Sequence, residues 1–224
     1  MRLVPDPGSF RNHHQLVFGI GGAESELNEE HREEFCSVVD LLLRTRQPNG
    51  PQNHPLWRLH PERWLESLII QDVTQIDERL QPTPVYSQVP AFSASDRAMI
   101  DVLGVTRQGR LAVLELKADE DVQLPLQGLD YWARVCWHHA RGEFEQFGYF
   151  PERGLAPDPP LLIYVAPALH VHPATDTLLR YFSPAIEWMV VGIDEHWREA
   201  VRVVFRKRPQ DIGGRLGKQV AAAS

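Results

Sequence analysis

The sequence predicts an α/β fold in which a central mixed β-sheet is flanked by helices. A hairpin gives the clearest pattern, because two apolar arms at 97–105 and 111–117 are joined by a short turn that contains Gly109. Helical spacing of apolar residues precedes the hairpin at 61–70 and follows it at about 124–141. Further strands are expected at 85–92, 161–165, 187–193 and 199–206, and a further helix at 173–181.

Three charged residues interrupt the apolar arms of this hairpin. Asp101 lies on the first arm, and the triplet Glu115-Leu116-Lys117 ends the second. Because side chains alternate faces along a strand, Glu115 and Lys117 point the same way, and pairing of the arms brings Asp101 close to both. Burying such groups costs several kcal/mol unless they pair or hold a cation, so a packed core rarely contains them.

Two interpretations fit these charges. In the simpler one, Lys117 forms a salt bridge with Asp101 at a sheet edge and Glu115 is solvated, since edge strands often carry charges. A third acid favours a functional site. In the helix at 61–70, Glu66 has apolar residues three and four positions later, which places its carboxylate toward the apolar side with Leu65, Leu68 and Ile69.

The helix at 124–141 is expected to have two distinct faces. One face is predicted to pack on the core and carries Leu126, Leu129, Ala133, Cys136, Trp137 and Ala140. A separate face could meet a ligand and carries Gln127, Tyr131, Arg134 and His138. For Arg134 and His138, an ordinary solvated surface is the simpler interpretation.

Taken in order, these features resemble the PD-(D/E)XK nuclease superfamily, and within it the NucS-like and RecB-like branches. The matching residues are Leu65-Glu66, Gln88, Ile100-Asp101, Glu115-Leu116-Lys117 and Gln127-x-x-x-Tyr131. The resemblance extends over roughly residues 61–170, about half of the chain. The chain departs from the family motif at Ile100, where the motif has Pro. The resemblance implies a restriction-endonuclease-like core with the order helix, three strands, helix and strand.

The resemblance also implies a role for each matching residue. Asp101, Glu115 and the backbone carbonyl of Leu116 would bind Mg²⁺ or Mn²⁺, hard cations that prefer oxygen ligands. Glu66 would complete the metal site, and Lys117 would orient or deprotonate the attacking water while holding the scissile phosphate. The residues expected to border the site and contact nucleic acid or metal-bound water are Gln88, Gln127, Tyr131 and Arg134.

The implied activity is metal-dependent hydrolysis of phosphodiester bonds in nucleic acid, with DNA favoured over RNA, by an endonuclease or an exonuclease. The alternative is a catalytically silent nucleic-acid-binding or assembly module of the same fold, because a fold does not fix its function. A homodimer or larger assembly is compatible with either. A third interpretation is a structural protein with a salt bridge and accidental motif spacing.

Charge is unevenly distributed along the chain. The formal net charge of −7 disfavours nucleic-acid binding, since phosphate contacts come from Lys and Arg. Residues 201–224, however, carry a net charge of +5, which leaves −12 for residues 1–200. The run Arg206-Lys207-Arg208 is therefore a candidate for phosphate contacts, although a solvated tail is the simpler explanation.

We expect three segments: an accessory segment at 1–55, the nuclease-like domain at 56–208 and a basic C-terminal tail at 209–224. The accessory segment is expected to be a helical extension of the core, with a strand at 15–20 and an acidic helix at 26–46. The residues of that helix expected to turn inward are Phe35, Val38, Val39, Leu42 and Leu43.

Composition limits the other function classes. Two cysteines do not make a disulfide framework, and neither a membrane-spanning apolar run nor a signal peptide is found, so a cytoplasmic protein without a membrane partner is expected. The histidine clusters at 13–14, 138–139 and 170–172 lack the spacing of zinc ligands. The glycines at 19–22 lack the Lys-Ser/Thr of a nucleotide-binding loop.

Overall fold

The computed structural model describes residues 2–5, 14–20, 23–90, 99–151 and 154–212. The chain folds into two compact units, Met1–Leu59 and His60–Ser224. The last two residues of the strand expected at 85–92, and most of the basic tail expected at 209–224, lie outside the described residues.

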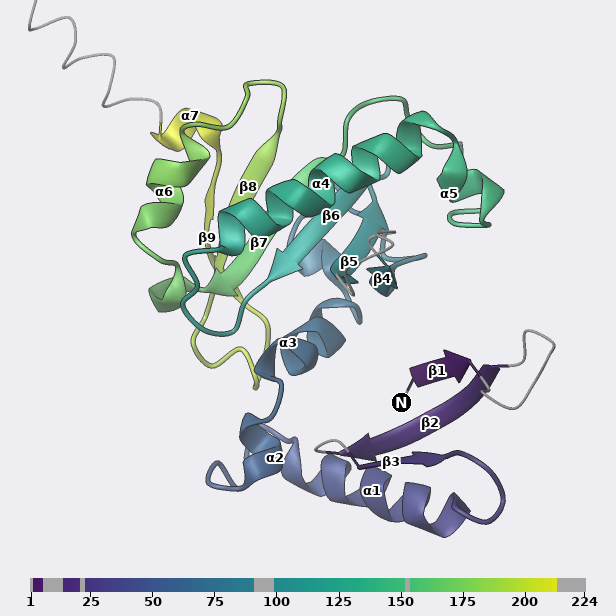
Figure 1. Ribbon diagram of the computed structural model, residues 1–224. Coiled ribbons are helices and arrows are strands. Elements are labelled where there is room, and N and C mark those ends of the chain that lie inside the picture. Colours follow the sequence, from purple (N-terminus) through teal and green to yellow (C-terminus); the bar gives the residue numbers. More distant parts are fainter. Residues whose placement is uncertain (1, 6–13, 21–22, 91–98, 152–153, 213–224) are drawn as a thin grey trace, which may run out of the picture. The chain divides into compact units, whose positions relative to one another are not determined.

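The first unit combines a small sheet with a helix (Figure 1). Strands β1 (Arg2–Pro5), β2 (His14–Ile20) and β3 (Ala23–Glu26) are antiparallel and lie in the order β1-β2-β3. The strand expected at 15–20 is confirmed as β2. The other two strands add a sheet to what the sequence presented as a helical extension.

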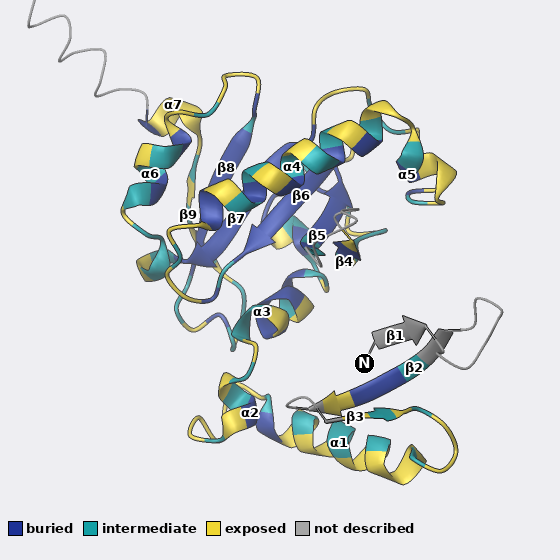
Figure 2. Cartoon of the chain, in the orientation of Figure 1, coloured by how far each residue is buried: buried dark blue, intermediate teal, exposed yellow. Residues whose placement is uncertain are grey.

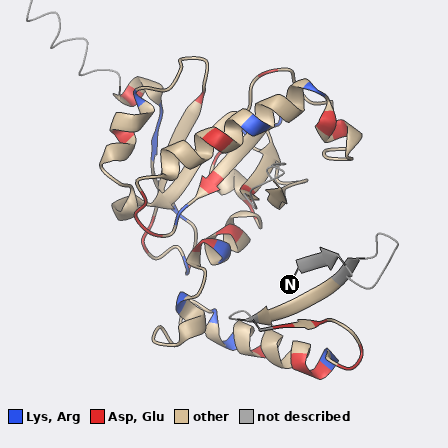
Figure 3. Ribbon diagram, in the orientation of Figure 1, with Lys and Arg blue, Asp and Glu red and all other residues tan. Residues whose placement is uncertain are grey.

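Helix α1 (Arg32–Thr45) begins later than the acidic pattern predicts, because residues 23–26 pair with β2 instead. Phe35 turns inward as expected and packs edge to face on Phe18 of β2, with ring centroids 5.2 Å apart. Leu43 is 62% exposed, so its expected burial is wrong. Acidic side chains gather along α1 and the segment before it (Figure 3). The short helix α2 (Pro55–Arg58) follows.

A six-stranded mixed sheet forms the centre of the second unit and confirms the predicted α/β class (Figure 1). Its order is β4-β5-β6-β7-β8-β9. The strands are β4 (Tyr86–Pro90), β5 (Met99–Val105), β6 (Leu111–Leu116), β7 (Leu161–Pro167), β8 (Trp188–Ile193) and β9 (Val203–Lys207). Strands β6, β7 and β8 run parallel, and the remaining neighbours are antiparallel.

Helices flank this sheet in the expected succession. They are α3 (Pro61–Ile69), α4 (Leu124–Ala140), α5 (Glu143–Gln146), α6 (Ala174–Leu179) and α7 (Pro209–Ile212), with 3₁₀ turns η1 (Val73–Gln75) and η2 (Ala168–His170). The predicted order of helix, three strands, helix and strand is realised by α3, β4, β5, β6, α4 and β7, with α5 inserted before β7.

The predicted hairpin is formed by β5 and β6. Val102 pairs with Leu114 in an antiparallel register, and Gly109 in the turn has a φ of +88°, a conformation that glycine adopts without strain. Extending this register by one pair sets Asp101 opposite Glu115. The hairpin therefore brings the two acids together at the end that lies away from the turn.

Both faces of the sheet are covered, and every residue of β6, β7 and β8 is buried (Figure 2). Tyr164 of β7 points to α4, because its hydroxyl donates to the carbonyl of Pro125 at 2.8 Å. Glu115 lies beside Tyr164 in the parallel register of β6 and β7. Adjacent partners share a face, so Glu115 also lies on the α4 side of the sheet.

Helix α4 turns a different face to the sheet than the sequence predicts. Leu126 and Trp137, expected in the core, are 47% and 57% exposed, whereas Tyr131 and His138 are buried. Ala133 and Ala140 are exposed as well, and Leu129 and Cys136 are half-buried. The buried residues of the helix are Leu124, Pro125, Gly128, Tyr131, Val135 and His138.

Close approach at Gly128 accounts for this rotation. A Cβ at Gly128 would lie only 2.4 Å from Cε1 of Tyr164, so glycine lets this side of α4 approach the sheet. The polar His138 can be buried on the same side because Nδ1 pairs with the carboxylate of Glu143. Long-range packing thus outweighs the greater hydrophobicity of the opposite side.

The basic run at 206–208 is part of the fold. Arg206 and Lys207 belong to β9, and the Arg206 guanidinium donates to the carbonyls of Ile76 and Gln75, both at 2.9 Å. Lys207 Nζ bonds to both carboxylate oxygens of Asp176, at 2.9 and 3.0 Å. The solvated-tail interpretation is therefore wrong for these two residues, because their charged groups are engaged in tertiary contacts.

Candidate active site

Glu66 lies on the buried side of α3. Pro61 opens the helix, where a missing N–H removes no helical hydrogen bond. Trp64, Leu65 and Ile69 form the buried apolar side. Glu66 is only 6% exposed, so its carboxylate turns inward as the spacing predicts.

Two side chains satisfy the Glu66 carboxylate. The Gln88 amide donates from Nε2 to Oε2, and Nη1 of Arg63 lies 3.5 Å from the same oxygen. Gln88 has a φ of +52°, a left-handed backbone conformation that is uncommon outside glycine. Conformational outliers of this kind concentrate at functional sites.

Asp101 links the two arms of the hairpin through its side chain. Its Oδ2 accepts the backbone N–H of Leu116 at 2.9 Å, and the Gln88 amide further stabilises the charged form. The salt bridge considered between Asp101 and Lys117 is absent from the described residues. Lys117 pairs instead with Glu115 and Asp121.

Glu115 is the most unusual residue of the site. It is 1% exposed, and neither carboxylate oxygen has a hydrogen-bond partner among the described residues. Nζ of Lys117 lies 3.8 Å from Oε1 and 3.4 Å from Oδ2 of Asp121. The idea of a solvated Glu115 is therefore wrong. A buried carboxylate without donors is destabilising unless a proton or a cation compensates it.

Burial raises the pKa of all three carboxyl groups. The pKa of Glu115 is raised well above its usual value of 4.5 by burial and then by the charge of Asp101, while Lys117 acts in the opposite direction. Burial also raises the pKa of Asp101 and of Glu66, and the charge of Asp101 adds to the effect at Glu66. Burial thus disfavours the charged form of each of these acids, most strongly at Glu115.

Tyr131 of α4 borders these acids. Its hydroxyl accepts a hydrogen bond from Nε2 of Gln127 at 3.1 Å. Burial raises the pKa of Tyr131, and the charges of Glu115 and Asp101 raise it further. The hydroxyl is therefore within electrostatic reach of both carboxylates.

Arg134 is engaged elsewhere on α4, since Nε donates to Oδ2 of Asp130 at 2.8 Å. The sequence pattern did not predict two further residues of the site. Asp121 could have been found from its spacing of four residues from Lys117. Tyr164 lies near Glu115, and burial followed by the charge of Glu115 raises its pKa. The expected residues that the structure brings together are Glu66, Gln88, Asp101, Glu115, Lys117, Gln127 and Tyr131.

The donor set fits a divalent cation that keeps part of its water shell. Within the described ranges, no three side chains of His, Cys, Asp or Glu form a preformed metal cluster. Mg²⁺ is usually held by only one or two carboxylates and retains several waters. Glu115, with both oxygens unpartnered, and the neighbouring Asp101 supply two such carboxylates.

Histidines of two of the clusters have other contacts, and His13 of the cluster at 13–14 lies outside the described residues. Nε2 of His139 lies 2.8 Å from the carbonyl oxygen of Ala156, and Nε2 of His170 lies 3.5 Å from the Glu195 carboxylate. In the part of the chain that the structure describes, no helix has both the length and the apolar character to span a bilayer. Cys36 and Cys136 are both free thiols.

The fold and the site define an α/β protein in which two buried acids, Glu66 and Glu115, lie near the half-buried Asp101 and Lys117. No family model and no curated protein matches the chain. Among solved structures, the chain is similar to a repair endonuclease from Pyrococcus abyssi, with 23% sequence identity and a TM-score of 0.38. The match covers 57% of this chain and 45% of that chain, so this chain spans less than half the length of that protein.

Proposed function

We propose that the protein is a metal-dependent nuclease of the PD-(D/E)XK type that hydrolyses phosphodiester bonds of nucleic acid. One observation carries the proposal: Glu115 is buried next to Asp101, and neither of its oxygens accepts a hydrogen bond from the residues that the structure describes. Its Oε1 lies 3.8 Å from Nζ of Lys117. A buried carboxylate whose oxygens accept no hydrogen bond weakens a structural core, whereas a divalent cation would compensate its charge.

Asp101 and Glu115 would hold Mg²⁺ or Mn²⁺, and the backbone carbonyl of Leu116 would be a further ligand. Glu66 would complete the metal site, with Gln88 orienting its carboxylate. When bound, the ion would supply positive charge to the phosphate and acidify a bound water.

The protein's own groups would position the reactants. Asp121 lies 3.4 Å from Nζ of Lys117 and orients the ammonium group, which would hold the scissile phosphate and align the attacking water. The Tyr131 hydroxyl, fixed by Gln127, would contact the nucleic-acid strand or a water at the same site. No comparable role is supported for Arg134, whose described ion pair is with Asp130.

A catalytically silent nucleic-acid-binding or assembly module is the second candidate. The observation that favours assembly is the exposed apolar side of α4, where Leu126 is 47% and Trp137 is 57% exposed. Apolar side chains grouped on one helix face mark interaction surfaces. The same surface would serve a homodimer or larger assembly of an active nuclease.

We further propose DNA as the substrate and the cytoplasm as the location. Cys36 and Cys136 are free thiols, which accords with a reducing compartment. The three segments proposed from the sequence, with a nuclease-like domain at 56–208, place the whole acid site in one domain.

Cleavage assays test the proposal. The purified protein is incubated with labelled single-stranded, duplex, flapped and mismatched DNA, and with RNA counterparts, in Mg²⁺, Mn²⁺ or EDTA. Cleavage is expected only with metal, and Asp101→Ala, Glu115→Ala and Lys117→Ala should each lose activity on the order of 10²-fold or more. Activity that survives EDTA would contradict the metal mechanism. Binding without cleavage on every substrate would favour the silent module.

A further inference from the structure

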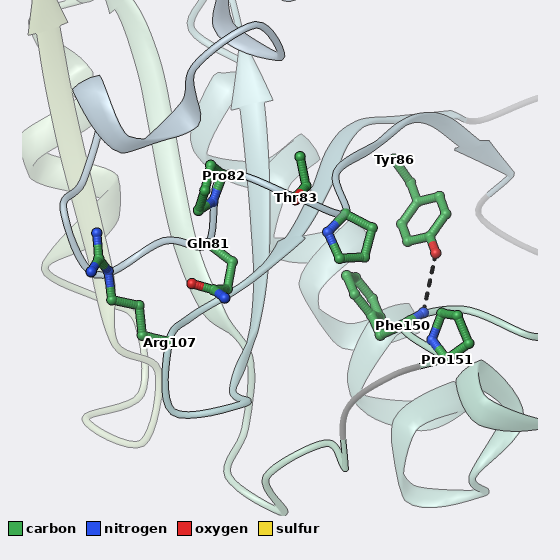
Figure 4. A pocket seen from close by; sticks show the side chains of 8 residues that line it. Gln81, Pro82, Thr83, Tyr86, Arg107, Phe150 and Pro151 are labelled. Atoms are coloured by element: carbon green, nitrogen blue, oxygen red, sulfur yellow. Dashed lines mark hydrogen bonds between the residues drawn. The ribbon is translucent and has the colours of Figure 1, made fainter.

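A cavity of about 560 Å³ lies at the start of β4, apart from the acids (Figure 4). Its walls come from the loop before β4, with Pro82 and Thr83, from Tyr86 of β4, and from Phe150, which follows α5. Figure 4 shows Tyr86 and Phe150 on one side of the cavity and Arg107 on the other. The cavity therefore has an aromatic wall and a cationic one.

The aromatic wall is held in place by its own contacts. The Tyr86 hydroxyl accepts the backbone N–H of Phe150 at 3.1 Å, and the two rings meet edge to face with centroids 5.0 Å apart. The ring of Tyr149 packs on Tyr86 from a centroid distance of 4.8 Å. Phe150 is 1% exposed, whereas Tyr86 is only half-buried. Tyr86 thus offers a fixed, accessible ring on which a flat ligand can stack.

The opposite wall carries a positioned cation. Nε of Arg107 donates to the carbonyl of Glu78 at 3.1 Å, and its backbone N–H donates to the carbonyl of Arg79 at 2.8 Å. Its terminal guanidinium nitrogens have no partner among the residues that the structure describes, so they can donate to a ligand. The exposed hydroxyl of Thr83 adds a further donor and acceptor at the cavity. An aromatic platform opposite an arginine suits a nucleobase with its attached phosphate.

Tyr86, which lines the cavity, lies on the same sheet face as the acids. Tyr86 pairs with Leu103 of β5, and Leu103 lies two residues from Asp101 on that strand. Side chains two residues apart point to the same face, and two residues span about 7 Å along a strand. Tyr86 lies one strand further across, so its backbone is roughly 8 Å from that of Asp101, and Arg107 in the hairpin turn lies at the end of the cavity away from the acids. A single nucleotide can bridge the distance from Tyr86 to Asp101, so a strand with one base stacked on Tyr86 can place the adjacent phosphate at the acids.

Building on the proposed nuclease function, we propose that this cavity binds an unpaired nucleobase next to the bond that is cut. The base stacks on Tyr86, and Arg107 contacts the phosphate or the base edge. A paired base is stacked on both faces and cannot enter without being flipped out of the duplex. The cavity would therefore favour substrates with an unpaired base at this position over a continuous duplex.

Binding of a series of strands, in which an abasic site is moved from one position to the next, tests this assignment. Short single strands, each lacking the base at one position, are titrated into the full-length protein by fluorescence anisotropy, with Ca²⁺ replacing Mg²⁺ to limit cleavage. One position is expected at which loss of the base weakens binding by roughly tenfold. Tyr86→Leu should weaken binding of the intact strand to a similar extent and should show no further loss at that position.

Three controls separate the outcomes. Tyr86→Phe keeps the ring and should keep the position effect, Arg107→Gln should weaken binding, and Arg180→Gln, another exposed arginine of this unit, should not. Melting curves identify variants that fail to fold. If the Tyr86 variants do not fold, the loss of binding in Arg107→Gln is the test. Mg²⁺-dependent cleavage without any position effect would overturn the cavity assignment and leave the nuclease proposal intact. A position effect in a protein that never cleaves would overturn the nuclease proposal but not base binding.

Discussion

The backbone N–H of Leu116 donates to Oδ2 of Asp101 at 2.9 Å, and this bond joins the two arms of the hairpin where their acids converge. It fixes the Asp101 carboxylate next to Glu115. Asp101→Asn can keep an oxygen acceptor for the same N–H while removing the charge. The amide variant therefore separates the structural role of the side chain from its electrostatic role.

Stability should depend on pH through Glu115. Burial raises its pKa well above 4.5, so over a range above that value the folded protein keeps a proton that the unfolded chain has released. The free energy of unfolding therefore falls as the pH rises above about 4.5. Glu115→Gln cannot titrate and should lose less stability over this range. In chelator at pH 8, the free energy of unfolding of Glu115→Gln, measured by urea denaturation, should equal that of wild type or exceed it by about 1 kcal/mol.

Divalent metal should make wild type more stable than the amide variants Glu115→Gln and Asp101→Asn. Mn²⁺ binds the folded state and should raise the Tm of wild type, with a much smaller rise for Glu115→Gln and Asp101→Asn. A structural ion pair predicts another outcome. Both amide variants would then lose about 3–5 kcal/mol in chelator, and metal would have no effect on any of the three proteins.

Lys117 and Lys207 form a matched pair, because each ammonium group contacts a carboxylate but only Lys117 lies at the acids. Lys117→Met should lower kcat on the order of 10²-fold or more, since it removes the positive charge of the site. Lys207→Met breaks the contact with Asp176 and should retain cleavage while losing up to about 1 kcal/mol of stability. Equal losses of kcat in the two variants would speak against a role for Lys117 in the chemistry.

Gly128→Ala should destabilise the protein and disturb the site. The added Cβ would lie 2.4 Å from Cε1 of Tyr164, so α4 must move away from the sheet at a cost of about 1–3 kcal/mol. Tyr131, one turn later, should shift with it, and cleavage should fall. Gly104→Ala is the control, because a Cβ there meets nothing within 4 Å. Thermal melting compares the two, and a similar Tm for both would refute the close-packing argument.

Arg206→Gln separates the structural and the nucleic-acid roles of the basic run. Its guanidinium donates to the carbonyls of Ile76 and Gln75, so its loss should cost about 1 kcal/mol in unfolding experiments. The salt dependence of nucleic-acid binding should stay unchanged. A slope that flattens by roughly one unit would instead indicate a lost phosphate contact.

The hairpin and the clustering of its acids could be predicted because both arms are contiguous in sequence and alternate with a period of two. The inward direction of Glu66 could be predicted in the same way, because it follows from the nearby positions of Ile69 and Ile70 on the same helix. Its partner Gln88 comes from another element. The lack of hydrogen-bond donors to the Glu115 oxygens among the described residues could not be predicted, because it depends on the side chains that all the neighbouring elements place around them.

The face of α4 was predicted wrongly for a physical reason. Hydrophobicity alone favours burying Leu126 and Trp137, but the contact of Gly128 with Tyr164 joins segments far apart in sequence and decides the rotation. The partners of Arg206 are likewise remote, on η1 and the residue after it. Strands β1 and β3 are short and carry little periodic signal, and they depend on pairing with β2.

The residues of the candidate site lie on separate elements. Glu66 belongs to α3, Asp101 to β5, Glu115 to β6 and Tyr131 to α4. A chain that has made only part of the sheet contains every one of these residues but does not hold them together. Under the proposed function, an incompletely folded molecule would therefore be unable to cleave nucleic acid, and activity would begin only once folding is complete.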